Sequence, residues 1–315
     1  MRGDENDPIY QSELSKYGFK PKGNAVWAKT ALGSAIHEIL RIRANNSQVT
    51  DEKDMEIEPM ISTAFFKAIL DLERQHQKVQ FTDEDLVNPS KKEKQKRKLL
   101  NQGERILRKV RRIIDFSKLN IVGTELSFKF QHPTLGLWFA GSADLVLAVN
   151  PDKFSPRIKT PQDFYSPKVI TDEQNLLPII WDYKTTINHI PLQESVQHHI
   201  YALAALYGYW TRKAFYEKDK HKLNFEKCDD WFSFNQFAPF YYIYLWDLLS
   251  NSRPAFSTIV SAQKRKNKKP TVVKANGRNK ITIIYAFQGA ETLEIAKSES
   301  IEIVEQRTKE WLQQF

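Results

Sequence analysis

The chain has 315 residues, of which 41% are hydrophobic and 12% aromatic, so it can bury a sizeable core and is not disordered throughout. Its net charge of +9 favours a polyanionic partner, with nucleic acid ahead of an anionic membrane surface. The one cysteine, Cys228, excludes a disulfide framework, a zinc cluster or an iron–sulfur cluster built within a single chain, and indicates a reducing compartment.

The N-terminal segment has none of the features of a targeting signal. Residues 1–20 are polar, with acidic side chains at Asp4, Glu5 and Asp7, and they lack an apolar run or a basic amphipathic stripe. No stretch of the sequence approaches the roughly 20 apolar residues of a membrane span. We therefore expect a cytoplasmic protein with no signal peptide and no membrane partner.

The first third of the chain is predicted to be helical after an extended arm over residues 1–23. Apolar residues recur at helical spacing over 28–44, 58–80 and 92–115. The last of these segments carries lysines and arginines opposite its apolar side chains. That face is either a phosphate-binding surface or a charged face that is merely solvated.

A β-hairpin is predicted next. Residues 120–131 and 137–149 have strand-like patterns, and the turn signal Pro133-Thr134-Leu135-Gly136 separates them. Residues 150–178 are rich in Pro, Asp, Lys and Ser and are predicted to form a long loop. Residues 179–185 then form a short, strongly apolar strand.

The rest of the chain mixes helix and strand. We predict a helix over 191–217, strands over 239–249 and 281–287, a basic loop over 264–269 and a closing helix over 292–315. The order of elements predicts an α/β fold, with one mixed central sheet flanked by helices and an N-terminal helical region.

Two of the predicted strands carry charged residues within an otherwise apolar run. Asp182 and Lys184 are two apart, so they share one face of a strand, and Tyr183 packs into the opposite face. They form either a structural ion pair or part of a site. Asp144, three residues after Gly141, stands in the apolar run of the hairpin and either caps a turn or shares a divalent cation with Asp182.

The following predicted helix presents Gln197 and Tyr201 on one face, because they are four residues apart. Both side chains can hydrogen-bond a phosphate, a base edge or a metal-bound water. His198 and His199 are expected to face solvent. His37, on the first predicted helix, is of interest because of the residues that follow it in the chain.

Taken in order, these residues resemble the motif series of RecB-like nucleases in the PD-(D/E)XK superfamily. The series comprises His37, Glu125, Gly141-x-x-Asp144, Asp182-x-Lys184 and Gln197-x-x-x-Tyr201. The resemblance implies a restriction-endonuclease-like core and a site in which the catalytic and supporting residues are Asp144, Asp182, Lys184, Glu125, Gln197 and Tyr201. It implies that Mg²⁺ or Mn²⁺ is bound by His37, Asp144, Asp182 and the carbonyl of Tyr183.

The resemblance covers roughly residues 28–210. For the whole chain we expect an extended arm over 1–23 and a single nuclease domain over 24–315. Within that domain we expect a helical part over 24–116, a catalytic core over 117–217 and a C-terminal part over 218–315 that completes the sheet. Family members with an iron–sulfur cluster need four cysteines, so no cluster is expected in this chain.

The function implied is metal-dependent hydrolysis of DNA by an exonuclease, acting on single strands or duplex ends in repair, recombination or phage genome processing. The alternatives are an inactive nucleic-acid-binding protein with a nuclease-like fold and an adaptor with a basic surface. The sequence leaves open exonuclease against endonuclease, RNA as substrate, a homo-oligomer, and replication or recombination partners. For base stacking, Phe164 and Tyr165 are candidates, whereas Trp27 and Trp138 are expected in the core.

Overall fold

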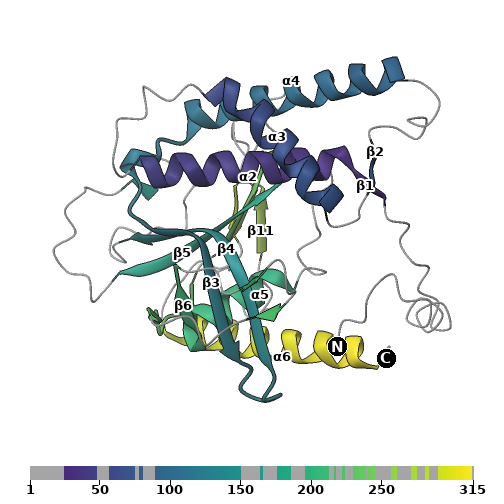
Figure 1. Cartoon of the computed structure of the whole chain (residues 1–315). Helices are drawn as coiled ribbons and strands as arrows, with labels where there is room; N and C mark the ends of the chain where they lie inside the picture. The colour runs from purple at the N-terminus through teal and green to yellow at the C-terminus, as the bar shows by residue number, and fades with distance from the viewer. Residues whose placement is uncertain are drawn as a thin grey trace.

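The computed structural model describes residues 25–47, 57–74, 78–80, 89–149, 164–165, 176–185, 196–212, 216–217, 222–223, 230–238, 240–245, 257–260, 271–274, 281–283 and 290–313. The predicted arm over 1–23, the basic run over 264–269 and most of the predicted loop over 150–178 lie outside these residues. Within them the chain has an α/β fold, in which helices flank one mixed sheet (Figure 1).

Five neighbouring strands of the sheet carry the candidate site. Their order is β9-β5-β4-β3-β6, with bounds Phe240–Tyr244, Leu177–Lys184, Trp138–Val149, Ile121–Gln131 and Tyr209–Thr211. β5 and β9 run parallel, whereas β4 is antiparallel to both β5 and β3, and β6 is antiparallel to β3. The predicted hairpin is therefore present as β3 and β4.

Three further strands continue the main sheet beyond β9, and four others form separate small sheets among the described residues. β12 (Ile281–Ile283), β10 (Ser257–Val260) and β11 (Thr271–Lys274) extend the sheet in that order beyond β9. Two pairs form small sheets of their own: β1 (Ala25–Trp27) with β2 (Lys78–Gln80), and β7 (Tyr216–Glu217) with β8 (Lys222–Leu223).

Helices cover the two faces of the sheet (Figure 1). One layer comprises α2 (Ala28–Asn46), α3 (Ile57–Arg74) and α4 (Pro89–Ile113), followed by the 3₁₀ helix η2 (Phe116–Lys118); the other comprises α5 (Gln197–Tyr207) and α6 (Ala290–Leu312). Alternate residues of β5 divide between the layers, since Ile179 and Trp181 join the core under α2 whereas Ile180 joins the core over α5. None of the described helices is both long enough and apolar enough to cross a membrane.

Two predicted helices are shorter than their patterns indicate. The helix predicted over 58–80 ends at Arg74, and Lys78–Gln80 pairs with Ala25–Trp27 as a strand. The helix predicted over 191–217 ends at Tyr207, and the chain continues as β6. The reason is local: the backbone is extended at Gly208, and Trp210 is fully buried with its Nε1–H donating to the Ala204 carbonyl at 2.9 Å.

The aromatic side chains also differ from expectation. Trp138, expected in the core, is 57% exposed, because β4 begins with it near the tip of the β3–β4 hairpin, which α2–α4 do not cover (Figure 1). Phe164, expected to be available for stacking on bases, is buried against Trp181 and Tyr241. Tyr165 is partly buried, and its hydroxyl accepts a hydrogen bond from the backbone N–H of Asp115 at 2.8 Å.

His198 and His199, expected to face solvent, are only 2% and 4% exposed. α6 packs over them, and His199 Nδ1 lies 3.0 Å from the hydroxyl oxygen of Ser300. Burial lowers the pKa of both histidines, that of His199 to about 4. The prediction was wrong because the covering helix comes from a distant part of the sequence.

We expect His199 to make the protein less stable as the pH falls from 6.5 to about 4. In that range the folded state keeps the imidazole neutral while the unfolded chain binds a proton, so the free energy of unfolding rises with pH. Urea denaturation gives the free energy of unfolding of wild type and of His199→Gln at pH 4.5 and at pH 7.5. The difference between the two proteins should change by about 2 kcal/mol from one pH to the other. A difference that stays constant over this range would contradict the assignment.

Candidate metal centre

β4 and β5 separate at the position of Asp144. The last pair of partners in their ladder is Leu145 with Trp181. Beyond that pair, the backbone N–H of Tyr183 donates to the side chain of Asp144, at 2.6 Å from Oδ2. A carboxylate thus takes part in holding the two strands together at the fork where their ladder ends.

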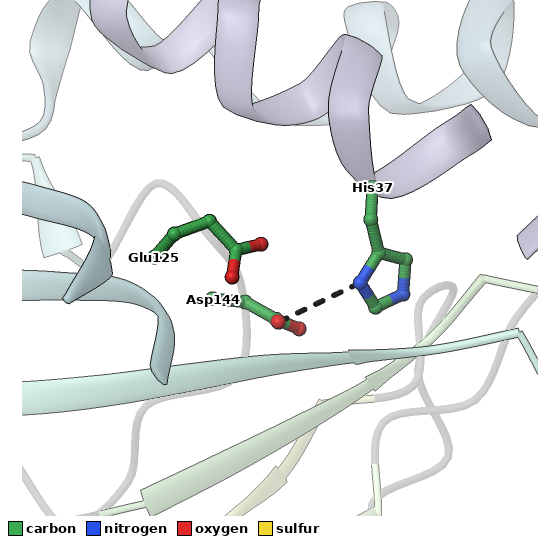
Figure 2. A group of neighbouring side chains, drawn as sticks. All are labelled: His37, Glu125 and Asp144. Atoms are coloured by element: carbon green, nitrogen blue, oxygen red, sulfur yellow. Dashed lines mark ion pairs between the residues drawn. The ribbon is translucent and has the colours of Figure 1, made fainter. Parts of the chain in front are cut away.

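A histidine from α2 and two carboxylates from the hairpin converge beside this fork. Atoms of His37, Glu125 and Asp144 that can bind a metal all lie within 4.8 Å of one another (Figure 2). His37 Nδ1 is 3.5 Å from Asp144 Oδ1, and the two side chains are 26% and 15% exposed. One imidazole and two carboxylates suit a divalent cation, and the imidazole favours Mn²⁺ over Mg²⁺.

The backbone of Glu125 is strained where it enters this cluster. Its φ of 49° lies in the left-handed region, which costs roughly 1–3 kcal/mol for a residue other than glycine. The β3–β4 register pairs Leu126 with Ala143 and Thr124 with Leu145, so Glu125 stands opposite Asp144. Strain that persists in a folded protein is concentrated at functional positions, and this residue belongs to the candidate site.

Burial and the nearby charge of Asp144 raise the pKa of two carboxyl groups at the fork, those of Glu125 and Asp182. Burial, and then the charge of Asp144, raises the pKa of Glu125 to about 7 and that of Asp182 to about 6. Burial acts to lower the pKa of His37, but the contact with Asp144 and the nearby carboxylates outweigh it, and the pKa is raised. Crowded carboxylates of this kind fit a site whose ligand is a cation.

On the other side of the fork, Asp182 and Lys184 form an ion pair with 2.6 Å between Oδ2 and Nζ. Gln197 of α5 holds this pair: its Nε2 donates to Asp182 Oδ1 at 3.0 Å, and its Oε1 accepts from Lys184 Nζ at 2.7 Å. Gln197 Nε2 also donates to the hydroxyl of Tyr201 at 3.0 Å, and that hydroxyl donates to the carbonyl of Ser142 at 2.7 Å. The network connects α5 to both β4 and β5.

Asp182 and Tyr183, the other two predicted ligands, lie outside the cluster formed by His37, Glu125 and Asp144. Asp182 is nevertheless close enough for the charge of Asp144 to raise its pKa. Its Oδ2 is buried and lies 2.6 Å from the Lys184 ammonium, which neutralises it. For Tyr183 it is the backbone N–H that contacts Asp144, and the role of its carbonyl stays a prediction.

A small hollow beside the cluster is lined in part by His37, Arg41, Thr124 and Glu125. Arg41 was not among the predicted site residues, and its guanidinium donates to both carboxylate oxygens of Glu38 at 2.7 and 2.8 Å. Arg41 is four residues after His37 on α2, and this spacing is the signal that could have identified it. It places a guanidinium beside the cluster.

We expect Mn²⁺ to raise the melting temperature of the metal-free protein by about 5 °C at saturation, and by less at pH 5.5 than at pH 8. The pKa values of Glu125 and Asp182, about 7 and about 6, exceed their ordinary values of 4.5 and 3.8. The folded state therefore binds more protons than the unfolded chain in this range, and without metal its stability falls as the pH rises. Mn²⁺ offsets the repulsion between the carboxylates only at pH values at which they are ionised.

Scanning fluorimetry of Asp144→Asn provides the test of the metal effect, with Glu104→Gln on α4 as the matched control. The first variant should lose the Mn²⁺-dependent increase, whereas the control should keep it. An equal increase in both proteins would show that the cation binds elsewhere.

Comparison with known proteins leaves the site to be interpreted from its own geometry. No protein-family model, no curated protein and no solved structure matches the chain.

Proposed function

We propose that this protein is a metal-dependent nuclease with a PD-(D/E)XK-type core, which hydrolyses phosphodiester bonds of DNA at the fork between β4 and β5. The observation that carries the proposal is the convergence of His37, Glu125 and Asp144 next to the Asp182–Lys184 pair. Nothing else among the described residues combines possible cation ligands with a partly buried lysine in this way. Function as an exonuclease in repair, recombination or phage genome processing, in the cytoplasm, is part of the proposal.

The chemistry divides between the two sides of the fork. His37, Glu125 and Asp144 would hold Mg²⁺ or Mn²⁺, which supplies charge neutralisation for the phosphate and lowers the pKa of water. Lys184 is fixed by Asp182 and Gln197, so its ammonium has a defined position. From there it would either orient the attacking water or stabilise negative charge on the phosphate.

A purely structural role does not account for this arrangement. An ion pair at a strand end needs neither a strained Glu125 nor two neighbouring carboxyl groups with raised pKa values. The same features count against an inactive binding protein, because removing one carboxylate would relieve the repulsion. The carboxylates stay crowded at the fork, where a bound cation would turn their repulsion into attraction.

The charge distribution supports a polyanionic substrate. α4 contains eleven lysines and arginines and two glutamates, a balance of +9 that equals the net charge of the whole chain. Leu99, Ile106, Leu107 and Val110 face the core, which leaves many of the basic side chains exposed on the opposite face. The basic excess is thus concentrated on one helix, and this favours phosphate binding over general solubility.

We expect Lys184→Ala to reduce DNA cleavage at least about a hundredfold while the fold and DNA binding are retained, because the ammonium acts on the reacting groups. The measurement is a gel assay on linear and circular DNA with Mg²⁺, Mn²⁺ or EDTA. Lys309→Ala, an exposed lysine on α6, is the matched control and should cleave normally. Intact circular DNA would identify an exonuclease, and normal cleavage by Lys184→Ala would refute the site.

The salt dependence of DNA binding tests the role of α4. Each phosphate contact adds about 0.9 to the slope of log affinity against log salt for duplex DNA, or about 0.7 for a single strand. Replacing the exposed Arg97, Lys98 and Arg105 by glutamine should therefore reduce the slope by about 2–3. Replacing Arg307 and Lys309 on α6 is the control, and an equal reduction there would assign the effect to overall charge.

A further inference from the structure

The outer half of the β3–β4 hairpin carries exposed aromatic side chains beside a lysine. Trp138 on β4 is 57% exposed and Tyr209 on β6 is 49% exposed. Lys129 on β3 places its Nζ 5.9 Å from the Trp138 ring centre and 4.3 Å from that of Trp231. We call these four residues the aromatic platform. Large aromatic rings left in water next to a cation are a feature of surfaces that bind a partner.

The platform lies on the same face of the sheet as the candidate metal centre. Lys129 is paired with Ala140 on one side and Tyr209 on the other, so the three side chains share a face. Along β4, Trp138, Ala140 and Ser142 are exposed, whereas the residues between them are partly buried. Asp144 is the next residue in this alternate series.

The exposed series therefore leads along β4 to the cluster. From Trp138 to Asp144 there are six residue steps, or about 20 Å at the rise of a β-strand. Beyond Asp144 every residue of β4 is buried, because both faces of the sheet are packed against helices there. The open part of the face thus ends at the candidate metal centre.

We propose that the platform binds single-stranded DNA, with bases stacked on Trp138 and Tyr209, the phosphates near Lys129, and the strand directed along β4 towards Asp144. This proposal rests on the proposed nuclease function and specifies its substrate as a single strand. Exposed rings can stack only on bases that are unpaired, since a duplex buries its base faces. The lysine between the rings matches a phosphate backbone, and the basic excess of the chain has the same sign.

The test is binding of the full-length protein to a fluorescein-labelled 12-nucleotide oligo(dT), measured by anisotropy in EDTA so that no metal-dependent cleavage occurs. A duplex of equal length and vesicles containing anionic phospholipid are measured in parallel. Trp138→Ala and Tyr209→Ala should each weaken single-strand binding about tenfold. Trp138→Phe should restore most of the affinity, because it keeps a ring.

Trp311→Ala is the matched control, since Trp311 on α6 is 56% exposed and lies outside the platform. It should bind oligo(dT) within about twofold of wild type. Loss of affinity confined to the platform variants, with unchanged melting temperatures, supports the proposal. Single-strand binding that is unchanged in Trp138→Ala, an equal loss for duplex, or vesicle binding that depends on Trp138 would overturn it.

The two proposals can fail separately. Single-strand binding that depends on the platform, combined with no cleavage in Mg²⁺ or Mn²⁺, would remove the nuclease activity and keep the platform. Cleavage that depends on Lys184 but has the same KM for single strands in Trp138→Ala as in wild type would keep the nuclease and remove the platform.

Discussion

The candidate site depends on one hydrogen bond, from the backbone N–H of Tyr183 to the carboxylate of Asp144. A backbone donor on a buried strand needs an acceptor, and where the β4–β5 ladder ends this acceptor is a charged side chain. The bond holds Asp144 at the fork, with its second oxygen near His37. The strands can separate there without leaving the donor unsatisfied, and the carboxylate has a fixed orientation.

The same arrangement is electrostatically unfavourable without a cation, and three features of the structure limit the effect. Lys184 neutralises part of the charge of Asp182, and Gln197 keeps both in place through hydrogen bonds to each. His37 lies on the other side of Asp144 and is stabilised in its charged form. The pKa of Glu125, about 7, exceeds that of Asp182, about 6, so Glu125 is the more readily neutralised of these two groups in the metal-free protein.

Sequence patterns predicted the parts of this site that depend on the geometry of a single strand or a single helix. The two-residue period places Asp182 and Lys184 on one face, and the i, i+4 spacing brings Gln197 and Tyr201 together. Sequence could not predict what covers each face. His199 is buried by Ser300, about a hundred positions away, and Trp138 is exposed because α2–α4 do not reach the hairpin tip. Apolar composition alone does not distinguish these cases, because burial depends on how elements distant in sequence pack.

The limit of the helical layer also explains where a site can exist on this sheet. Under α2, the residues of β4 beyond Leu145 are packed on both faces, and a polar ligand would have to displace apolar side chains. Near the hairpin tip the face is open but has no acidic cluster of this kind among the described residues. Asp144 stands at the boundary, with His37 of α2 on the covered side. On the proposed function, a strand of DNA lying on the open part of this face would meet ligands that the packed core holds in place.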